Sequence, residues 1–515
     1  MHRWHIPRWH IPRWHIPRLH HPRFARLHNP KVAVSVVFVA SMFVNILDAT
    51  IVNVALPTIS ADLGVPVTAT ATIAVGYLVS LAVFIPASGW LGDRFGTKRI
   101  LLIALAVFTG ASALCGLAQN LTELVLFRII QGAGGGLLTP VGMAMLYRTF
   151  PPAERMRASR ILTVPTTLAP ATGPILGGLL VDQLSWRWIF DVNVPIGIAA
   201  FAFGLIFLRE SREPDPGRFD VPGFLLAAGG LGLSMYALSE GASHGWGTPR
   251  IVVSGIVGIA LLIAMVVVEM RSPAPMLVLR LFRDRLFRTA NALTLMTSMA
   301  FLGTLYVFPL MLQDGLGYSP LAAGLSTFPE ALGVMTAAQL VSRAYPLVGP
   351  RRLMGLGVIA VPLLMVTLAQ TGLHPNAWLM RAEMYGLGFF MATIFMPNQT
   401  AAFATIGPAS TGRASTIYNA TRQIGSALGV AVLGTVLVIV GTTKRSGSGV
   451  VRPNLTAYHT AFYVAAILLA SGMALVLTVR DSDAAATMVR RVKPTVETAS
   501  PEAAVSPQTI GRTGS

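Results

Sequence analysis

Apolar residues in this chain fall in blocks of about twenty, the length of helix that crosses ~30 Å of hydrocarbon, and short polar segments separate the blocks. Fourteen spans are predicted, at residues 32–56, 68–91, 100–120, 123–147, 159–181, 188–208, 221–241, 251–270, 289–312, 320–342, 353–370, 377–404, 414–440 and 457–479. The pattern therefore predicts an all-α polytopic membrane protein.

The composition supports this interpretation. Of the 515 residues, 53% are hydrophobic and only 12% are charged, against about 25% charged residues in an average soluble protein. The lone Cys115 can form no internal disulfide. Collagen-like chains, coiled coils, disordered proteins and disulfide scaffolds are thereby excluded.

The net charge of +18 reports membrane topology rather than a nucleic-acid partner. If the N-terminus is cytoplasmic, most of the 39 Lys and Arg residues fall in inner segments, as the positive-inside rule requires. The outer loops would hold only five, Arg187, Arg250, Lys444, Arg445 and Arg452. We expect a multi-pass protein of the inner (cell) membrane with both termini in the cytoplasm, in contact with the lipid bilayer and with no nucleic acid.

Weak internal repeats predict two six-helix halves. Gly96-Thr97-Lys98-Arg99 follows the second span and Gly349-Pro350-Arg351-Arg352 follows the tenth, and many secondary transporters build two such halves around a central site. The expected division is a basic tail with Arg-Trp-His-Ile-Pro repeats (1–31), a first half (32–208), a linker with two inserted spans (209–288), a second half (289–479) and a disordered tail (480–515).

Asp48 is the clearest functional candidate, because an ionisable residue in the membrane costs about 2.5–3.5 kcal/mol on insertion scales. Asn45 lies three residues earlier on the same helix face. Burial disfavours the carboxylate whereas a nearby cation favours it, so a carboxyl between these effects can load and release a proton. The alternative is a structural ion pair that never titrates.

Other charged residues also lie within predicted spans. Arg128 shares a face with Gln131, and Asp48 is the candidate partner of its permanent charge. Glu330 is expected near the middle of the tenth span, either as a second acid for protons or cationic substrates or as a residue that faces a wet cavity. Arg422 could balance Glu330 or Glu383. Glu269, at a span end, is expected to need no special function.

Several ordered motifs resemble those of the major facilitator superfamily, and specifically its fourteen-helix drug:proton antiporter branch. They are Gly89-x-Leu91-Gly92-Asp93-Arg94-Phe95-Gly96-x-Lys98-Arg99, Leu47-Asp48-Ala49-Thr50-Ile51-Val52-Asn53, Arg128-x-x-Gln131-Gly132-x-Gly134, Gly173-Pro174-x-x-Gly177-Gly178, Trp186-Arg187-Trp188-Ile189-Phe190 with Asn193-x-Pro195, and Asn419-x-x-Arg422-Gln423-x-Gly425. The resemblance covers about residues 31–480.

The resemblance implies roles for these residues. Asp48 and Arg128 would couple proton movement. Glu330 is added to them as a third proton-coupling candidate because of its expected burial, and not because of the resemblance. The gating loop would be formed by Gly89, Asp93, Arg94, Gly96, Lys98 and Arg99, with Arg148 a candidate partner for Asp93. The antiporter motif would be Gly173, Pro174, Gly177 and Gly178. Candidates to line the substrate cavity are Asn45, Gln131, Asn419, Arg422 and Gln423.

The chain departs from the pattern at three places. Ala169 stands where the antiporter motif usually begins with glycine, Asp191 where the branch often has an apolar residue, and Pro346 where Asp93 would align in the second half. These departures bear on the type of substrate more than on the fold.

The expected function is proton-coupled efflux of amphipathic drugs or toxic compounds by alternating access, by a monomer with no cofactor or metal that draws on the proton motive force. One alternative is a dedicated exporter of one endogenous metabolite, antibiotic, lipid or siderophore. Another is a non-transporting membrane sensor. An enzyme is not expected, because the sequence has no Walker loop, metal-ligand cluster or Ser/His/Asp set.

Overall fold

The computed structural model describes residues 29–150, 155–213, 218–272, 275–407, 410–445 and 451–488. The Arg-Trp-His-Ile-Pro repeats and most of the C-terminal tail lie outside these ranges. In the described residues, nearly all regular structure is helical, and 11 helices are long and apolar enough to cross a membrane. The expected all-α membrane fold is confirmed.

The first half consists of six spans in chain order. They are α2 (Pro30–Leu63), η1 with α3 (Val67–Thr70, Ala71–Phe95), α4 (Thr97–Leu117), α5 (Leu121–Thr149), α6 (Arg155–Gln183), and α7 with α8 (Trp188–Asp191, Asn193–Phe207). The first span is longer than predicted, because helix α2 continues to Leu63 and ends only where Gly64 adopts a φ of 64°, a left-handed conformation that glycine permits.

Two inserted helices, α9 (Val221–His244) and α10 (Pro249–Arg271), follow the first half. They pack mainly against each other, and α9 also contacts α3 of the first half and α16 of the second. Helix α10 has little protein on its other sides: Val253, Ile256 and Ile263 are each more than half exposed. Exposed aliphatic side chains on a membrane helix face lipid, so α10 lies at the periphery.

The second half repeats the six-span plan after the short turn η3 (Leu279–Arg283). Its spans are α11 with the π-helical turn η4 (Arg285–Leu310, Met311–Gly315), α12 with α13 (Pro320–Thr327, Pro329–Val348), α14 (Pro350–Leu368), α15 (Ala377–Ala402), α16 (Thr411–Val440), and α17 with α18 (Leu455–Ser471, Met473–Thr478). A short helix, α19 (Ala485–Met488), follows. The tenth span is interrupted at Phe328–Pro329, which the hydropathy did not predict.

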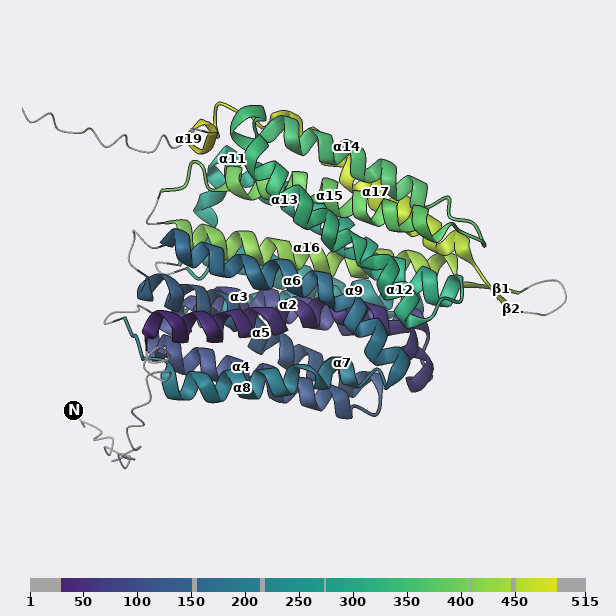
Figure 1. The fold of residues 1–515 in the computed structure, drawn as a ribbon, viewed down its shortest axis with the longest axis horizontal. Coiled ribbons are helices and arrows are strands. Elements are labelled where there is room, and N and C mark those ends of the chain that lie inside the picture. The colour runs from purple at the N-terminus through teal and green to yellow at the C-terminus, as the bar shows by residue number, and fades with distance from the viewer. Residues whose placement is uncertain are drawn as a thin grey trace, which may run out of the picture.

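The two halves lie side by side with their helices roughly parallel to one long direction (Figure 1). The strands β1 (Thr443–Arg445) and β2 (Val451–Pro453) form an antiparallel hairpin at one end. The start of α2 and helix α19 lie at the opposite end, so both ends of the described chain are on one side (Figure 1). We call these the hairpin end and the terminal end.

Candidate functional site

Asp48 lies at the centre of a buried polar network in the first half. It is near the middle of α2, and its side chain is fully buried. Arg128 Nη1 of α5 donates to Asp48 Oδ2 at 2.6 Å, and Gln131 Nε2 donates to Oδ1 at 2.9 Å. Arg128 and Gln131 reach the same carboxylate because they are three residues apart on one helix face. The structure thus brings together the acid and base that the sequence proposed as partners.

A third donor, Asn193, was not identified as a site residue from the sequence. Asn193 Nδ2, in the first turn of α8, donates to Asp48 Oδ1 at 3.1 Å and lies 3.2 Å from Ser112 Oγ of α4. Ser112 in turn donates to the carbonyl of Phe190 at 2.8 Å. Asn193 stood in the quoted Asn-x-Pro motif, which was the available signal. The network therefore links four spans through one carboxylate.

Arg128 is enclosed rather than hydrated. Its guanidinium lies over the rings of Tyr77, with Cζ 4.0 Å from the ring centroid, and Phe190, at 5.6 Å. Its Nη1 also donates to Gln131 Oε1 at 2.7 Å, while Nε has no hydrogen-bond partner among the residues that the structure describes. A buried cation held by one carboxylate and two aromatic faces depends strongly on that carboxylate.

Two of the predicted cavity residues are engaged within the first half. Gln131 is fully buried in the network with Asp48. Asn45 Nδ2 donates to the carbonyl of Gly135 at 2.8 Å, and Tyr77 Oη donates to Asn45 Oδ1 at 3.3 Å. In this conformation both amides join α2, α3 and α5 instead of presenting free polar groups.

The second half carries its charges differently. Glu330 is 6% exposed and lies in the first turn of α13, directly after the interruption at Pro329. Arg422 of α16 is exposed even though it lies well inside the span. Within the described residues, neither side chain forms an ion pair, so Arg422 balances neither Glu330 nor Glu383 here.

The remaining predicted cavity residues also belong to α16. Asn419 is half-buried, and its amide donates back to the carbonyl of Ser415 at 2.9 Å. Gln423 is half-buried beside Arg422. Asn419 and Gln423 are neutral, so Arg422 is the charged residue of the Asn419-x-x-Arg422-Gln423 motif.

The predicted gating loop joins α3 to α4 at the terminal end. Asp93 accepts from Arg148 Nη2 at 2.7 Å, and Glu213 lies 3.8 Å from the same atom. Arg94 and Arg99 are exposed, Gly89 has open space around it, and Lys98 Nζ donates to the carbonyl of Leu205 at 2.8 Å. Asp93 and Arg148 thus pair as the sequence suggested.

Glu210, which the sequence placed in a polar linker without a role, completes this loop. Its carboxylate accepts from the backbone N–H groups of Lys98 at 3.0 Å and Arg99 at 3.2 Å, in the first turn of α4. Gly96 has a φ of 101°, and a Cβ there would overlap the Glu210 carboxylate. The linker after α8 therefore holds the start of α4 by satisfying donors that a helix leaves open.

The glycines of the antiporter motif lie where α6 crosses α2 and α12. A Cβ on Gly173 would meet Thr50, and one on Gly177 would meet Ile51, both on α2. Gly178 faces the backbone of Leu321 in α12, and Gly324 of α12 faces the carbonyl of Pro174. The two halves are therefore in backbone contact near the hairpin end.

Comparisons with known proteins agree with this architecture. The family model described as "Major Facilitator Superfamily" matches residues 38–430. A "Multidrug resistance protein B homolog" from Mycobacterium tuberculosis is 33% identical over 410 residues, which cover 77% of this chain and 76% of that protein. A "Putative multidrug resistance protein MdtD" from Escherichia coli is 32% identical over 405 residues, covering 78% and 85%.

Solved structures share the fold at low sequence identity. The POT family transporter PepTSo matches with a TM-score of 0.61 at 15% identity, covering 87% of this chain and 99% of that one. The human organic anion transporter MFSD10 matches with a TM-score of 0.55 at 14% identity and the same coverage. The family model and the relatives together establish the family, and membership of this family points to a transporter rather than an enzyme. The chain belongs to the major facilitator superfamily.

Proposed function

We propose that this protein exports amphipathic compounds across the inner membrane in exchange for protons, by alternating access. The relatives named as multidrug resistance proteins support efflux of varied compounds. The observation that carries proton coupling is the buried Asp48 carboxylate, which is held by Arg128, Gln131 and Asn193.

Protonation of Asp48 would change every contact in its network. The carboxylate accepts from three donors on two spans, and a neutral acid would leave the fully buried Arg128 without a counter-charge. An uncompensated buried charge is strongly unfavourable, so the side chains must rearrange when the proton arrives. A proton on Asp48 is thereby converted into a shift of α2 relative to α5 and α8.

Helix α2 also contacts the other half, which gives the shift a route across the molecule. Gln313 Nε2 of η4 donates to the carbonyl of Val54 at 2.7 Å. Helix α6, which packs on α2 through Gly173 and Gly177, meets α12 through Gly178. In our proposal the hairpin end faces outside, and loosening of α2 opens these contacts to release substrate.

The experiment is dye transport in proteoliposomes under an imposed proton gradient, with ethidium as the first dye. Asp48→Asn keeps the size of the side chain but cannot carry the exchanged proton. We expect gradient-driven transport by the native chain and its loss in Asp48→Asn. The matched control is Asp182→Asn, an exposed acid at the end of α6, which should transport normally.

Equal transport by the native chain and Asp48→Asn would refute Asp48 as the coupling acid and direct attention to Glu330. A dedicated exporter of one endogenous product would transport none of a panel of unrelated dyes yet confer resistance to a single compound. A non-transporting sensor would show neither activity.

A further inference from the structure

A second acid, Asp191, lies between the Asp48 network and the hairpin end of the first half. It is the last residue of the short helix α7, and it is partly exposed. A Cβ built on Gly116 of α4 would lie 2.5 Å from Asp191 Oδ1, so the carboxylate lies directly against the α4 backbone. Asp191 is therefore held beside the helix that also contributes Ser112 to the network.

Contacts along α4 place Asp191 one helical turn farther out than the network. Gly116, which Asp191 contacts, and Ser112 are four residues apart and share a helix face. Helix α4 runs from the gating loop at the terminal end toward the hairpin end, so Gly116 is the outer of the two. Ser112 Oγ lies 3.2 Å from Asn193 Nδ2, which donates to Asp48 Oδ1 at 3.1 Å. Asp191 thus precedes Ser112 and Asp48 on a line that leads inward from the hairpin end.

The layer of side chains outside Asp191 is in contact with water. Asp62, at the end of α2, accepts from Arg187 Nη1 at 2.9 Å, and their side chains are 47% and 32% exposed. Arg187 Nη2 also donates to the carbonyl of Ala118, two residues beyond Gly116, at 3.3 Å. Asp191 lies directly inside this hydrated layer, so it is the acid of the first half that connects the outer surface with the buried network.

Asp191 has no fixed partner in the described part of the chain. No side chain there donates to its carboxylate, and no cation pairs with it. The elements packed against α7 carry Asp62 on α2, Cys115 on α4 and Asp182 on α6, and α8 carries no titratable side chain. Asp62 is bound to Arg187, Cys115 is fully buried, and Asp182 is exposed at the end of its helix. Asp191 can therefore gain and lose a proton without breaking an ion pair.

Asn193 lies between the two acids and has an unused acceptor. Its Nδ2 donates to Asp48 and Ser112, while its buried Oδ1 has no partner among the described residues. A buried acceptor without a donor is unusual. Side chains four residues apart on a helix are separated by about 5–6 Å at Cβ, a gap that one water hydrogen-bonded at both ends roughly spans. The distance from Asp191 to the network is therefore short enough for transfer through water.

We propose that Asp191 is the relay through which the coupling proton enters from the outside. Its carboxylate takes a proton from the outer water and passes it to Asp48 by way of water that hydrogen-bonds to Ser112 and Asn193. Each water on this route accepts one proton and releases another, so Asp191 returns to its carboxylate form as Asp48 becomes neutral. This inference rests on the proposed function and adds the path by which its proton arrives.

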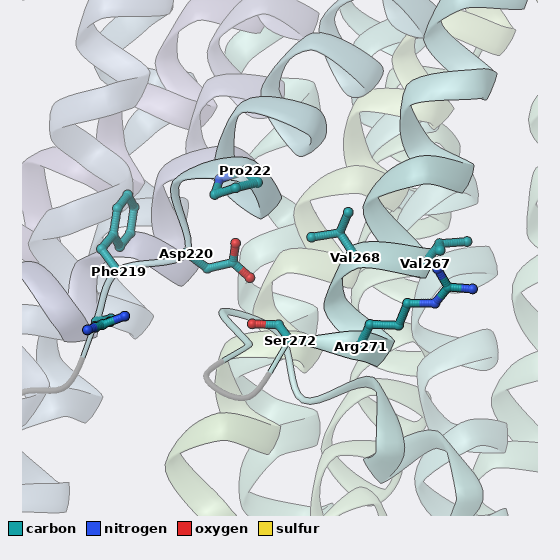
Figure 2. Close-up of a pocket in the computed structure, with 8 residues that line it drawn as sticks. Phe219, Asp220, Pro222, Val267, Val268, Arg271 and Ser272 are labelled. Carbon is teal, nitrogen blue, oxygen red and sulfur yellow. The ribbon is translucent and has the colours of Figure 1, made fainter.

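The acids of the inserted helix pair lie at the opposite end of the molecule and provide a matched comparison. Asp220 lines a pocket between the start of α9 and the end of α10 (Figure 2). The ring of Phe219 in this pocket packs 4.9 Å from that of Trp90, within the gating-loop motif, so the pocket is at the terminal end. Asp220 Oδ1 caps α9 by accepting from the N–H of Gly223 at 2.8 Å. Asp220 is thus a partly enclosed acid on the side from which the coupling proton does not enter.

The test is gradient-driven ethidium transport in proteoliposomes with the hairpin end outward, at a constant pH difference and varied outer pH. A positioned proton-transfer group contributes about 10²–10⁴-fold to rate, so we expect Asp191→Asn to slow transport about tenfold or more at alkaline outer pH. At acidic outer pH the rate should approach that of the native chain, because abundant protons then reach the network without a relay. Asp191→Glu keeps the carboxyl and should restore most of the rate. Asp220→Asn keeps its Oδ1 cap and should follow the native profile.

Ser112→Ala is the second variant, because it removes the hydroxyl that would hold the connecting water. It should slow transport with the same dependence on outer pH. The double variant Asp191→Asn/Ser112→Ala should be no slower than the slower single variant, since both groups serve one route. Additive slowing, equal slowing of Asp191→Asn at every outer pH, or a native profile in Asp191→Asn would overturn the proposal.

A measurement that does not require transport separates this proposal from the proposed function. After an acidic pH jump, the infrared carboxylate band that is lost in Asp48→Asn reports the protonation of Asp48. Its rate of change should fall in Asp191→Asn and not in Asp220→Asn. Slowed protonation in a chain that transports no dye would support the relay and count against drug efflux. Equal protonation rates in the native chain and Asp191→Asn would overturn the relay even if efflux is proton-driven.

Discussion

The two halves share one plan of six spans, yet they treat the charged residues within those spans in opposite ways. In the first half Asp48 and Arg128 are both enclosed and bound to each other at 2.6 Å. In the second half Glu330 is buried without a partner among the described residues, and Arg422 is exposed without one. The first arrangement suits a switch that responds to a proton, whereas the second leaves charges available to a ligand.

The loops after the second and tenth spans also differ between the halves, although both bind the start of the following helix. Glu210 binds the start of α4, and Asp481 binds the start of α14, where its Oδ1 accepts from the N–H of Arg351 at 3.0 Å. Gly96 and Gly349 both have positive φ, 101° and 86°. Only the first loop adds an acid, Asp93, paired with Arg148; Pro346 stands at the aligned position. Both loops thus hold a helix start, but one of them can also act as a latch.

The largest expected effect separates Arg128, which is buried, from Arg422, which is exposed. Arg128→Gln leaves Asp48 buried without its cation, and breaking a buried pair in this way costs about 3–5 kcal/mol. Arg422→Gln removes an exposed charge without an ion-pair partner here and should change the free energy of unfolding by about 0.5 kcal/mol or less. Thermal unfolding can be followed by reaction of Cys115, which is fully buried, with a thiol-specific dye.

The double variant Asp48→Asn/Arg128→Gln is the control for this first comparison. It removes both charges and should recover much of the stability lost in Arg128→Gln alone. Equal midpoints for Arg128→Gln and Arg422→Gln would contradict the proposed asymmetry between the halves.

A smaller effect concerns the two helix starts. Glu210→Ala removes a carboxylate that accepts from two backbone N–H groups of α4, and Asp481→Ala removes one that accepts from the backbone N–H of Arg351 in α14. An anion at a helix N-terminus is worth about 0.3–1 kcal/mol, and up to ~2 kcal/mol when partly buried. Hydrogen exchange at the first turn of α4 should therefore accelerate more in Glu210→Ala than that of α14 does in Asp481→Ala.

Glu213→Ala is the matched control, because Glu213 belongs to the same linker but its carboxylate lies near Arg148 instead of α4. It should leave exchange in the first turn of α4 unchanged. Faster exchange there in Glu213→Ala would mean that the linker as a whole, and not the Glu210 carboxylate, holds the helix.

Sequence alone predicted the spans and the central ion pair for physical reasons that apply to this chain. A twenty-residue apolar block has few alternatives to a membrane helix. A buried charge is so unfavourable that Asp48 and Arg128 each demanded a partner. The interruption between α12 and α13 was missed, because hydropathy averages over a span and does not register the single break at Phe328–Pro329.

The sequence did not identify residues whose side chains are neutral or were expected to be in contact with water, because such side chains carry little energetic penalty and do not require a partner. Asn193 and Ser112 are neutral, so neither required a charged partner; the Asn-x-Pro motif drew attention to Asn193 but did not identify it as a donor to Asp48. Glu210 stood in a polar linker, where a carboxylate is ordinarily solvated. Glu269 was expected to need no function at its span end, but tertiary packing leaves it 3% exposed. The contacts of each of these residues could be recognised only from the three-dimensional arrangement of the helices.

The smallest expected effect tests whether the Asp93–Arg148 pair is a latch. Both side chains are about one-third exposed, so a double-mutant cycle with Asp93→Asn and Arg148→Gln should give only about 0.2–1 kcal/mol of coupling in stability. Asp62–Arg187, near the hairpin end, pairs at 2.9 Å with similar exposure and is the matched control. Raising the salt to 1 M, where the screening length is ~3 Å, should reduce both couplings.

The same cycle measured on transport rate tests the latch itself. If Asp93–Arg148 holds one conformation of the transport cycle, its coupling measured on transport rate will exceed its coupling on stability. For Asp62–Arg187 the two couplings should be equal. If the two pairs show the same relation between these couplings, Asp93–Arg148 is not a latch. The loop between α3 and α4 would then only hold the start of a helix, as the corresponding loop of the second half does.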